Sequence, residues 1–444
     1  MNKTKNKLGI ILFPAFDWQI SKTHPERKER LLYTKDQIDE EGISDIEGIT
    51  FHNPIVATET DIKRVHFVVP DVSKILTNSH YISAGAAIKS LDLVMNKEVD
   101  KAFSLTRPPG HHAMRVVYGD RGFCVTNIEA VMIENIRQKY GNLKVAIIDT
   151  DAHHGDGTED IYWNDKNTLF ISLHQDGRTL YPGTGFTDEL GSPNAYGYNI
   201  NIPLPPNTGD EGFLYILDNL VLPILDDFKP DIIINSAGQD NHYSDPLTNM
   251  NFSAKGYALL NEKLNPDVAV LEGGYSIEGA LPYINTGIIL AMAGLDYSNV
   301  IEPDFHISKV TQSNDVTKYI EKLTEQIYSN WKNKDILSNN KFGDKQYVTE
   351  TKRIYYDTSN IMEHQVITYK RCDKCPGVTK IESTNDKNDN ILAINIPLGA
   401  CRKCQTEGKD LFNNNDVSQY TNVYLQDRVN DFYHQKWNLS NRTC

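Results

Sequence analysis

Residues 145–157 read VAIIDTDAHHGDG, so that a short apolar run passes directly into a series of aspartates and histidines. The run Val145–Asp149 is short and rich in branched side chains, which is typical of a strand buried on both faces of a parallel sheet. In open α/β sheets the ligand site lies beyond the carboxyl ends of the strands. The polar residues of this stretch therefore stand where a functional site is expected.

The same pattern, a short apolar run followed by a polar cluster, occurs four more times. The polar clusters are RPPGHH (107–112), His174, SAGQDNH (236–242) and EGGY (272–275), and the runs before them are Ala102–Leu105, Thr168–Leu173, Asp231–Asn235 and Val268–Leu271. Helical patterns such as Asn127–Tyr140 separate the runs, which predicts an α/β fold with a mainly parallel central sheet and helices on both faces. We expect the five clusters to form one site at the carboxyl ends of the strands.

Length and composition indicate a globular chain of more than one domain. The 444 residues are 39% hydrophobic and 23% charged, and no apolar run reaches the roughly 20 residues of a membrane helix. We predict a large α/β domain over 1–337, which closes with an amphipathic helix at Asp315–Lys334. A polar linker over 338–349 and a small β-rich domain over 350–444 are expected to follow.

The net charge and the cysteine pattern indicate which partners and which cellular compartment to expect. The net charge of −14 argues against nucleic acid as a partner. The apolar run Leu8–Phe13 is broken by Pro14, so we expect no secretory signal. Four of the six cysteines form two CxxC pairs rather than a disulfide framework, while Cys124 and Cys444 stand alone. This usage favours a reducing, cytoplasmic location.

Three residues in these clusters have the character of metal ligands. Asp151 and His153 are two residues apart, so at an extended strand end they point to the same side. Asp240, which follows another predicted strand, adds a second carboxylate. One nitrogen and two oxygen ligands leave a coordination position open for water, as a catalytic zinc site requires.

The motifs together resemble the zinc-dependent deacetylase superfamily, which includes histone deacetylases and acetylpolyamine amidohydrolases and has an arginase-like α/β fold. The segments that carry the resemblance occur in family order and are THPERKER (23–30), RPPGHHA (107–113), GFCVTN (122–127), DTDAHHGDGT (149–158), SLH (172–174), YPGTG (181–185), GQDNHYSDPL (238–247) and LEGGY (271–275). The resemblance implies a hydrolase that cleaves the amide of an acylated lysine or an acylated small amine.

The resemblance also implies a role for particular residues. It makes Asp151, His153 and Asp240 the zinc ligands, and it makes His111 and His112 a general acid/base pair oriented by Asp149 and Asp156. Tyr275 would stabilise the oxyanion, Gly122, Phe123, Tyr181 and Leu247 would line the substrate channel, and Asp149 and Ser172 would belong to a potassium site. Two residues depart from common family usage, namely Gln239 before the metal aspartate and Asp156 where many relatives have Asn.

Three alternatives stay open at this stage. A binuclear manganese ureohydrolase would need an Asp-x-His-x-Asp run, but the fifth position here is Gly155. An acetylpolyamine or other small-molecule amidohydrolase would carry an acidic residue after Asp245-Pro246, where this chain has the apolar Leu247. A binding module that has lost catalysis would lack a metal ligand, the histidine pair or the tyrosine, all of which are present.

The second half of the cysteine pattern predicts a separate metal site. Cys372 and Cys375 form one CxxC pair and Cys401 and Cys404 another, with 25 residues between the pairs. Two such knuckles, placed on hairpin turns, arrange four thiolates as in a structural zinc ribbon, with Ile391–Ile396 as one of its strands. We therefore expect two zinc ions per chain, one catalytic and one structural. The partner of this domain, whether a protein or a second copy of the chain, is left open.

Overall fold

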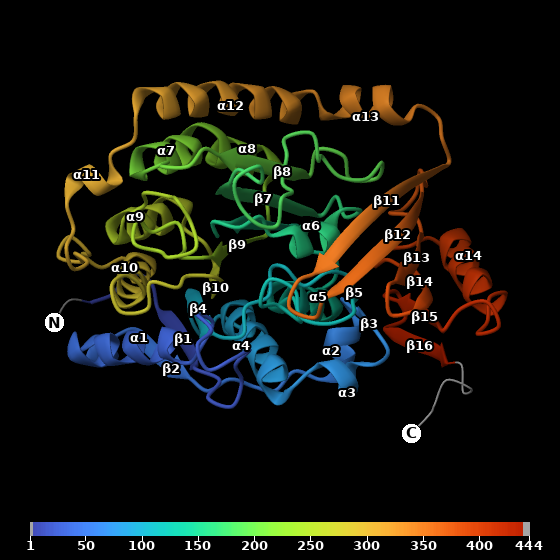
Figure 1. Cartoon of the computed structure of the whole chain (residues 1–444), viewed down its shortest axis with the longest axis horizontal. Coiled ribbons are helices and arrows are strands. Elements are labelled where there is room, and N and C mark those ends of the chain that lie inside the picture. Colours follow the sequence, from blue (N-terminus) through green and yellow to red (C-terminus); the bar gives the residue numbers. More distant parts are fainter. Residues whose placement is uncertain (1–2, 438–444) are drawn as a thin grey trace.

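The computed structural model describes residues 3–437, which form a large α/β part and a smaller C-terminal β-sheet at its side (Figure 1). Cys444, one of the two isolated cysteines, lies outside the described residues. The α/β architecture expected from the sequence is confirmed, as is a separate β-rich sheet that brings the four paired cysteines together.

The central sheet has eight strands in the order β2-β1-β4-β10-β9-β6-β7-β8, and every pair is parallel. Its strands are β1 (Leu8–Phe13), β2 (Ile49–His52), β4 (Lys101–Thr106), β6 (Val145–Asp149), β7 (Thr168–Gln175), β8 (Asn199–Leu204), β9 (Ile232–Ala237) and β10 (Val268–Leu271). β4, β6, β7, β9 and β10 are the five predicted runs. Strands β1, β2 and β8 were not predicted.

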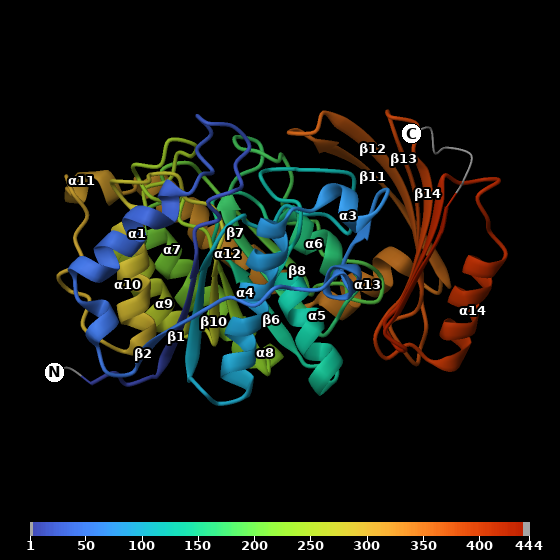
Figure 2. The same ribbon diagram turned by 90° about the horizontal axis from the view of Figure 1, so that it is seen from below.

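Helices cover both faces of this sheet (Figure 2). Side chains alternate between two cores along each strand, as with Ile148 and Ile171 in one core and Ile147 and Phe170 in the other. The first core contains residues of α1 (Glu29–Glu40), α7 (Asp210–Ile216), the π-helix η2 (Leu217–Val221), α8 (Leu222–Phe228), α9 (Ala254–Leu264), α10 (Leu281–Ala293) and α12 (Asn314–Lys332). The second contains residues of α2 (Glu59–Lys63), α3 (Val72–Ile75), α4 (Asn78–Met95), α5 (Ile128–Tyr140) and α6 (Asp156–Tyr162).

The connection between the two parts is shorter than predicted. The polar segment expected to be a linker over 338–349 is partly helical, because α13 runs over Lys334–Phe342, and β11 begins at Tyr347. Phe342 is buried and its ring packs edge-to-face on Tyr196 at 5.4 Å, which anchors the end of the helix to the large part. The division into domains over 1–337 and 350–444 remains a prediction.

The C-terminal sheet has six strands in sequential order, with α14 (Arg402–Asn413) on one face. The strands are β11 (Tyr347–Tyr356), β12 (Ile361–Lys370), β13 (Thr379–Asn385), β14 (Asn390–Ile396), β15 (Asn422–Asp427) and β16 (Phe432–Trp437). All neighbours are antiparallel except β14 and β15, which α14 connects as a crossover. The predicted strand Ile391–Ile396 is part of β14.

The other face of the C-terminal sheet packs on the large part, around the two-stranded sheet of β3 (Phe67–Val68) and β5 (Val116–Val117). The Tyr356 hydroxyl donates to the Val116 carbonyl at 2.6 Å, and Lys352 Nζ donates to Asp160 Oδ1 at 2.8 Å. Because the two parts bury a common hydrophobic cluster, the position of the C-terminal sheet relative to the large part is set by packing.

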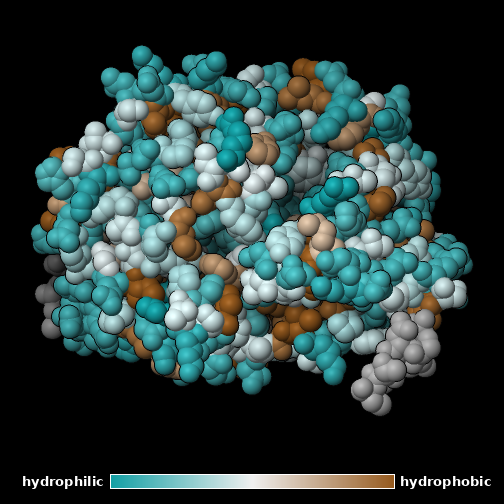
Figure 3. Space-filling model, in the orientation of Figure 1, coloured by the Kyte–Doolittle hydropathy of each residue, from teal (hydrophilic) through white to brown (hydrophobic). Residues whose placement is uncertain are grey.

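No helix among residues 3–437 combines the length and the apolar character needed to cross a bilayer. On the face seen in Figure 3, hydrophobic residues form scattered groups among hydrophilic ones rather than one continuous band.

Candidate active site and metal centres

The three residues predicted to bind a metal come together at the carboxyl ends of two neighbouring strands. Asp151 and His153 follow β6, and Asp240 follows β9. His153 Nδ1 lies 3.1 Å from Asp151 Oδ1 and 2.9 Å from Asp240 Oδ2. Backbone amides orient the carboxylates, since Gly273 N donates to Asp151 Oδ2 at 2.7 Å and Ala152 N donates to Asp240 Oδ1 at 2.7 Å.

This cluster fits a cation. The Asp151 and Asp240 side chains are fully buried, and one atom from each of the three side chains lies within 4.8 Å of the others. Burial opposes protonation of His153, but the carboxylates of Asp240 and Asp151 outweigh it and raise its pKa to about 10. Two buried carboxylates that converge on one imidazole nitrogen are stabilised by a positive charge between them, and a divalent metal ion can supply that charge.

The tandem histidines lie beside this cluster, and each contacts its own carboxylate. His111 Nδ1 is 3.1 Å from Asp149 Oδ2, and His112 Nδ1 is 2.9 Å from Asp156 Oδ1. The ring of His112 lies 6.0 Å from that of His153. These contacts engage the Nδ1 of each ring and leave the Nε2 atoms for chemistry on the side of the cavity.

The environments of the two histidines differ in charge. Burial opposes protonation of His111, but Asp151 and Asp149 outweigh it and raise the pKa of His111 well above its usual value. Burial and the neighbouring His111 lower the pKa of His112 to about 3. Arg121 donates to Asp156 Oδ1 at 2.8 Å, so the extra negative charge of this unusual aspartate is compensated. The pair can therefore hold one proton between a basic and an acidic ring.

Tyr275 contributes a phenol to the same cavity from the loop after β10. Its ring is 7% exposed and packs edge-to-face on Phe123 at 5.8 Å, with the Arg30 guanidinium 5.0 Å from the ring centre. Its backbone amide donates to Asp245 Oδ2 at 2.7 Å. Burial raises the pKa of Tyr275 well above its usual value, so the hydroxyl stays protonated and can donate a hydrogen bond.

A buried charged network supports this loop, and the sequence reasoning assigned its members no role. Arg107 Nε donates to Glu26 Oε1 at 2.7 Å, and Glu26 also forms an ion pair with Arg30. Arg30 Nε donates to the Gly274 carbonyl at 2.8 Å, while Glu272 Oε2 accepts from Gly110 N at 2.7 Å. All of these residues lie within the motifs THPERKER, RPPGHHA and LEGGY, so the motifs were the signal by which the network could have been found.

A cavity of about 240 Å³ opens beside His153 of the Asp151–His153–Asp240 cluster and beside the tandem histidines. Its lining residues are Pro109, His111, His112, Gly122, Phe123, His153, Leu180, Tyr181, Leu247, Gly273, Tyr275 and Asp357. All four residues predicted to line a channel are among them. Gly122 has a φ of +53°, and a Cβ there would lie 2.4 Å from His112 Cδ2, so a side chain would collide with the histidine.

One lining residue, Asp357, comes from the C-terminal sheet and was not predicted. It lies on the turn between β11 and β12, and its Oδ1 accepts hydrogen bonds from Gly122 N at 2.9 Å and from the Tyr181 hydroxyl at 3.2 Å. The motifs gave no signal for it, because it lies 176 residues beyond Tyr181 in the chain.

The residues predicted for a potassium site, Asp149 and Ser172, are register partners on β6 and β7. Asp149 Oδ1 accepts from Asp151 N at 3.1 Å, and the Ser172 hydroxyl lies 2.8 Å from His174 Nδ1. The two residues are thus neighbours, and a potassium ion there remains a prediction.

A third group with ligand-type side chains, formed by His154, Glu159 and Glu189, has its own internal partners. His154 Nε2 lies 3.2 Å from Glu159 Oε2, and Glu189 Oε2 accepts from Gly185 N at 2.7 Å. Asn201 Nδ2 also donates to Glu159 at 2.8 Å. This network holds the loop that carries Tyr181 against the sheet.

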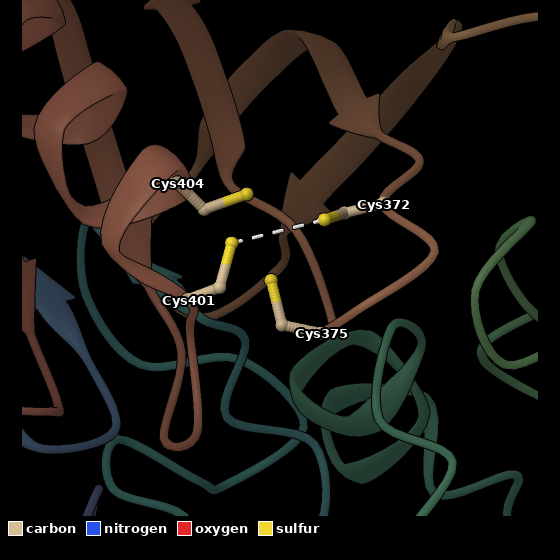
Figure 4. A group of neighbouring side chains, drawn as sticks. All are labelled: Cys372, Cys375, Cys401 and Cys404. Carbon is tan, nitrogen blue, oxygen red and sulfur yellow. Dashed lines mark hydrogen bonds between the residues drawn. The ribbon is translucent and has the colours of Figure 1, made fainter.

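The four paired cysteines converge between the β12–β13 connection and the start of α14 (Figure 4). The Sγ atoms of Cys372 and Cys401 are 3.9 Å apart, which is too long for a disulfide. Tetrahedral Zn–S bonds of ~2.3 Å place two sulfurs about 3.8 Å apart, so the spacing fits a bound metal. Cys401 caps α14 and Cys404 lies in its first turn, so the expectation that both pairs occupy hairpin turns was wrong for the second pair.

Two further sequence expectations have structural outcomes. A Cβ at Gly155 would lie 2.0 Å from Asp149 Oδ2, so no side chain fits where a ureohydrolase needs its second metal ligand. Gln239 is buried next to Asp240 in the chain and donates to Asn285, and it displaces none of the three ligand-type residues.

The fold and the site define a member of the histone deacetylase family. The family described as "Histone deacetylase domain" matches residues 70–291, which is half of the chain. The chain therefore belongs to this family.

Individual relatives agree with this assignment. A "Probable deacetylase" of Archaeoglobus fulgidus is 45% identical over 317 residues, which cover 65% of this chain and 87% of the relative. A "Histone deacetylase-like amidohydrolase" of Pseudomonas aeruginosa is 36% identical over 225 residues, covering 48% of this chain and 58% of the relative. A solved structure, "Crystal Structure of HDA15 HD domain", superposes with a TM-score of 0.63 at 25% identity and covers 76% of this chain and 99% of that one.

Proposed function

We propose that this chain is a zinc-dependent deacetylase that hydrolyses the amide of an acylated amine such as acetyl-lysine. The observation that carries the proposal is the convergence on one cavity of a buried Asp-His-Asp cluster, a histidine pair with separate carboxylate partners, and a tyrosine. Family membership supports the same reaction class.

Asp151, His153 and Asp240 are proposed to hold the catalytic zinc ion. When bound, zinc lowers the pKa of a water molecule and polarises the substrate carbonyl. The single imidazole and two carboxylates match the oxygen- and nitrogen-rich ligand set of catalytic zinc sites and leave room for water and substrate.

The protein's own groups then move the proton and stabilise charge. One histidine of the pair, held through its Nδ1 by Asp149 or Asp156, accepts the proton of the attacking water, and the pair returns a proton to the departing amine. The Tyr275 hydroxyl donates to the oxygen that becomes negative in the transition state. The aromatic rings of Phe123 and Tyr181 exclude water and contact the aliphatic part of the substrate.

The four cysteines are proposed to hold a second, structural zinc ion. Their donors are all sulfur, and four thiolates complete the tetrahedral coordination of zinc, so the site leaves no position for water. Its role would be to tie the start of α14 to the β12–β13 connection.

The test is to measure zinc content and acetate release on the purified full chain. We expect two zinc ions per chain, acetate release from an acetyl-lysine peptide or an N-acetylated amine, and loss of activity after chelation with recovery on adding zinc. Asp240→Asn should bind one zinc ion per chain and release no acetate. Protein with a full catalytic zinc site that cleaves no acylated amine would contradict the proposal and favour a binding module.

A further inference from the structure

The β11–β12 turn makes the C-terminal sheet part of the cavity wall. Figures 1 and 2 show β11 and β12 reaching from the C-terminal sheet over the large part. The turn is attached there by Asp120 N, which donates to Ser359 Oγ at 3.0 Å, and by Arg121 Nε, which donates to the Tyr355 carbonyl at 3.2 Å. These bonds, together with the two to Asp357, fix the turn against the loop that carries Gly122.

Asp357 gives this wall a negative charge. Among the described residues that line the cavity it is the only carboxylate, and the others are aliphatic, aromatic, glycine or histidine. Both of its hydrogen bonds use Oδ1. Within residues 3–437, no further hydrogen bond to this carboxylate is present, and no Lys, Arg or His side chain forms an ion pair with it. The half-buried Asp357 therefore contributes to the cavity wall a carboxylate that has no ion-pair partner, and its Oδ2 accepts no hydrogen bond from the described residues.

The distance between this charge and the Asp151–His153–Asp240 cluster sets the length of a ligand that could contact both. The Tyr181 ring lies 6.4 Å from the His153 ring, and the Tyr181 hydroxyl contacts Asp357. One tyrosine side chain thus spans the distance from a metal-ligand residue to the carboxylate. An amide at the metal cluster, followed by a short alkyl chain along Tyr181, would place the far end of the ligand at Asp357.

We propose that Asp357 forms a subsite for the free ammonium group of an acylated di- or polyamine. The proposal rests on the proposed function and names its substrate class. The apolar walls suit a chain of methylene groups, and the unused Asp357 oxygen suits a cation at its end. From the sequence, the apolar Leu247 favoured a lysine-like or neutral substrate. In the structure a carboxylate, that of Asp357, is part of the cavity wall and comes from the C-terminal sheet.

The test compares two substrates that differ in the terminal ammonium group, N-(4-aminobutyl)acetamide and N-butylacetamide. The wild-type chain should prefer the charged one in kcat/KM. Asp357→Asn should lower kcat/KM for the charged substrate by about ten- to hundredfold and leave the neutral one within about threefold. The amide oxygen of Asn can still accept from Gly122 N and Tyr181, so the change removes charge and keeps the hydrogen-bonding geometry.

Two controls separate a direct contact from a general effect of charge. Asp386→Asn removes one negative charge from the neighbouring β13–β14 turn, which does not line the cavity, and it should leave the substrate ratio unchanged. Raising the ionic strength should reduce the preference of the wild type and have less effect on Asp357→Asn. Inhibition by 1,4-diaminobutane should weaken in Asp357→Asn, which measures binding without turnover.

The outcomes are distinguishable. An unchanged substrate ratio in a folded, active Asp357→Asn protein overturns the subsite and leaves the proposed function standing. A wild type that cleaves an acetyl-lysine peptide well and ignores both small amines overturns it in favour of a peptide substrate. A chain that cleaves no acylated amine overturns both proposals.

Discussion

Replacing Tyr275 by Phe tests whether its hydroxyl takes part in the reaction. The substitution removes one oxygen and keeps the ring, whose contacts with Phe123 and Arg30 involve the ring itself. Within the described residues, no protein group accepts a hydrogen bond from this hydroxyl. A structural role would therefore be small, and the free energy of unfolding should change by less than about 1 kcal/mol.

The effect on turnover should be much larger. Loss of one donor to a developing oxyanion typically lowers kcat by about 10²–10³, which corresponds to about 2.7–4 kcal/mol of transition-state stabilisation. Because the hydroxyl interacts more strongly with the transition state than with the ground state, kcat should fall while KM stays nearly constant. Burial keeps the pKa of Tyr275 well above its usual value, so this deficit should not vary with pH below about 9.

The assay is steady-state acetate release by both proteins at matched zinc content. Tyr243→Phe serves as the control, because Tyr243 lies close in sequence to the proposed ligand Asp240 but does not line the cavity. It should keep nearly full turnover. A Tyr275→Phe protein with turnover within about threefold of wild type would remove this tyrosine from the mechanism.

Three further predictions concern other parts of the molecule. His112→Asn should lower kcat by about 10²–10⁴ without loss of zinc, since the side chain moves a proton and is not a proposed ligand, and loss of zinc from this variant would show otherwise. Cys372→Ser should reduce zinc from two ions to one per chain and lower Tm, as measured by metal analysis and thermal unfolding, and an unchanged Tm would argue against a structural site. Burial raises the pKa of Glu363 at the interface between the two parts to about 7, so the folded protein should lose stability as pH rises from about 4.5 to 7. Glu363→Gln should remove that loss, on the order of 3 kcal/mol at pH 8, and equal Tm–pH profiles for the two proteins would contradict it.

Local patterns in the sequence determined the sheet and the chemistry at its edge. A strand buried on both faces needs a short apolar run, which is why β4, β6, β7, β9 and β10 could be predicted. Spacing along one strand end also placed Asp151 and His153 on the same side, and parallel strands bring Asp240 to the same edge.

The tertiary structure alone decided features that depend on contacts between distant segments. Strand β8 was missed because Asn199 and Asn201 are buried, and their polarity is compensated by hydrogen bonds to Glu159, which no local pattern reveals. The predicted linker was longer than the observed connection, because the buried Phe342 anchors the polar helix α13 to the large part.

The largest such feature is the position of the C-terminal sheet. Its strands could be expected from their composition, but their placement depends on the hydrophobic cluster shared with β3 and β5 and on single hydrogen bonds such as that from the Tyr356 hydroxyl to Val116. That packing carries Asp357 to a cavity whose other walls lie in the large part. Sequence spacing determines which residues share a strand end, whereas side-chain packing between distant elements determines which charge lies at the end of the cavity.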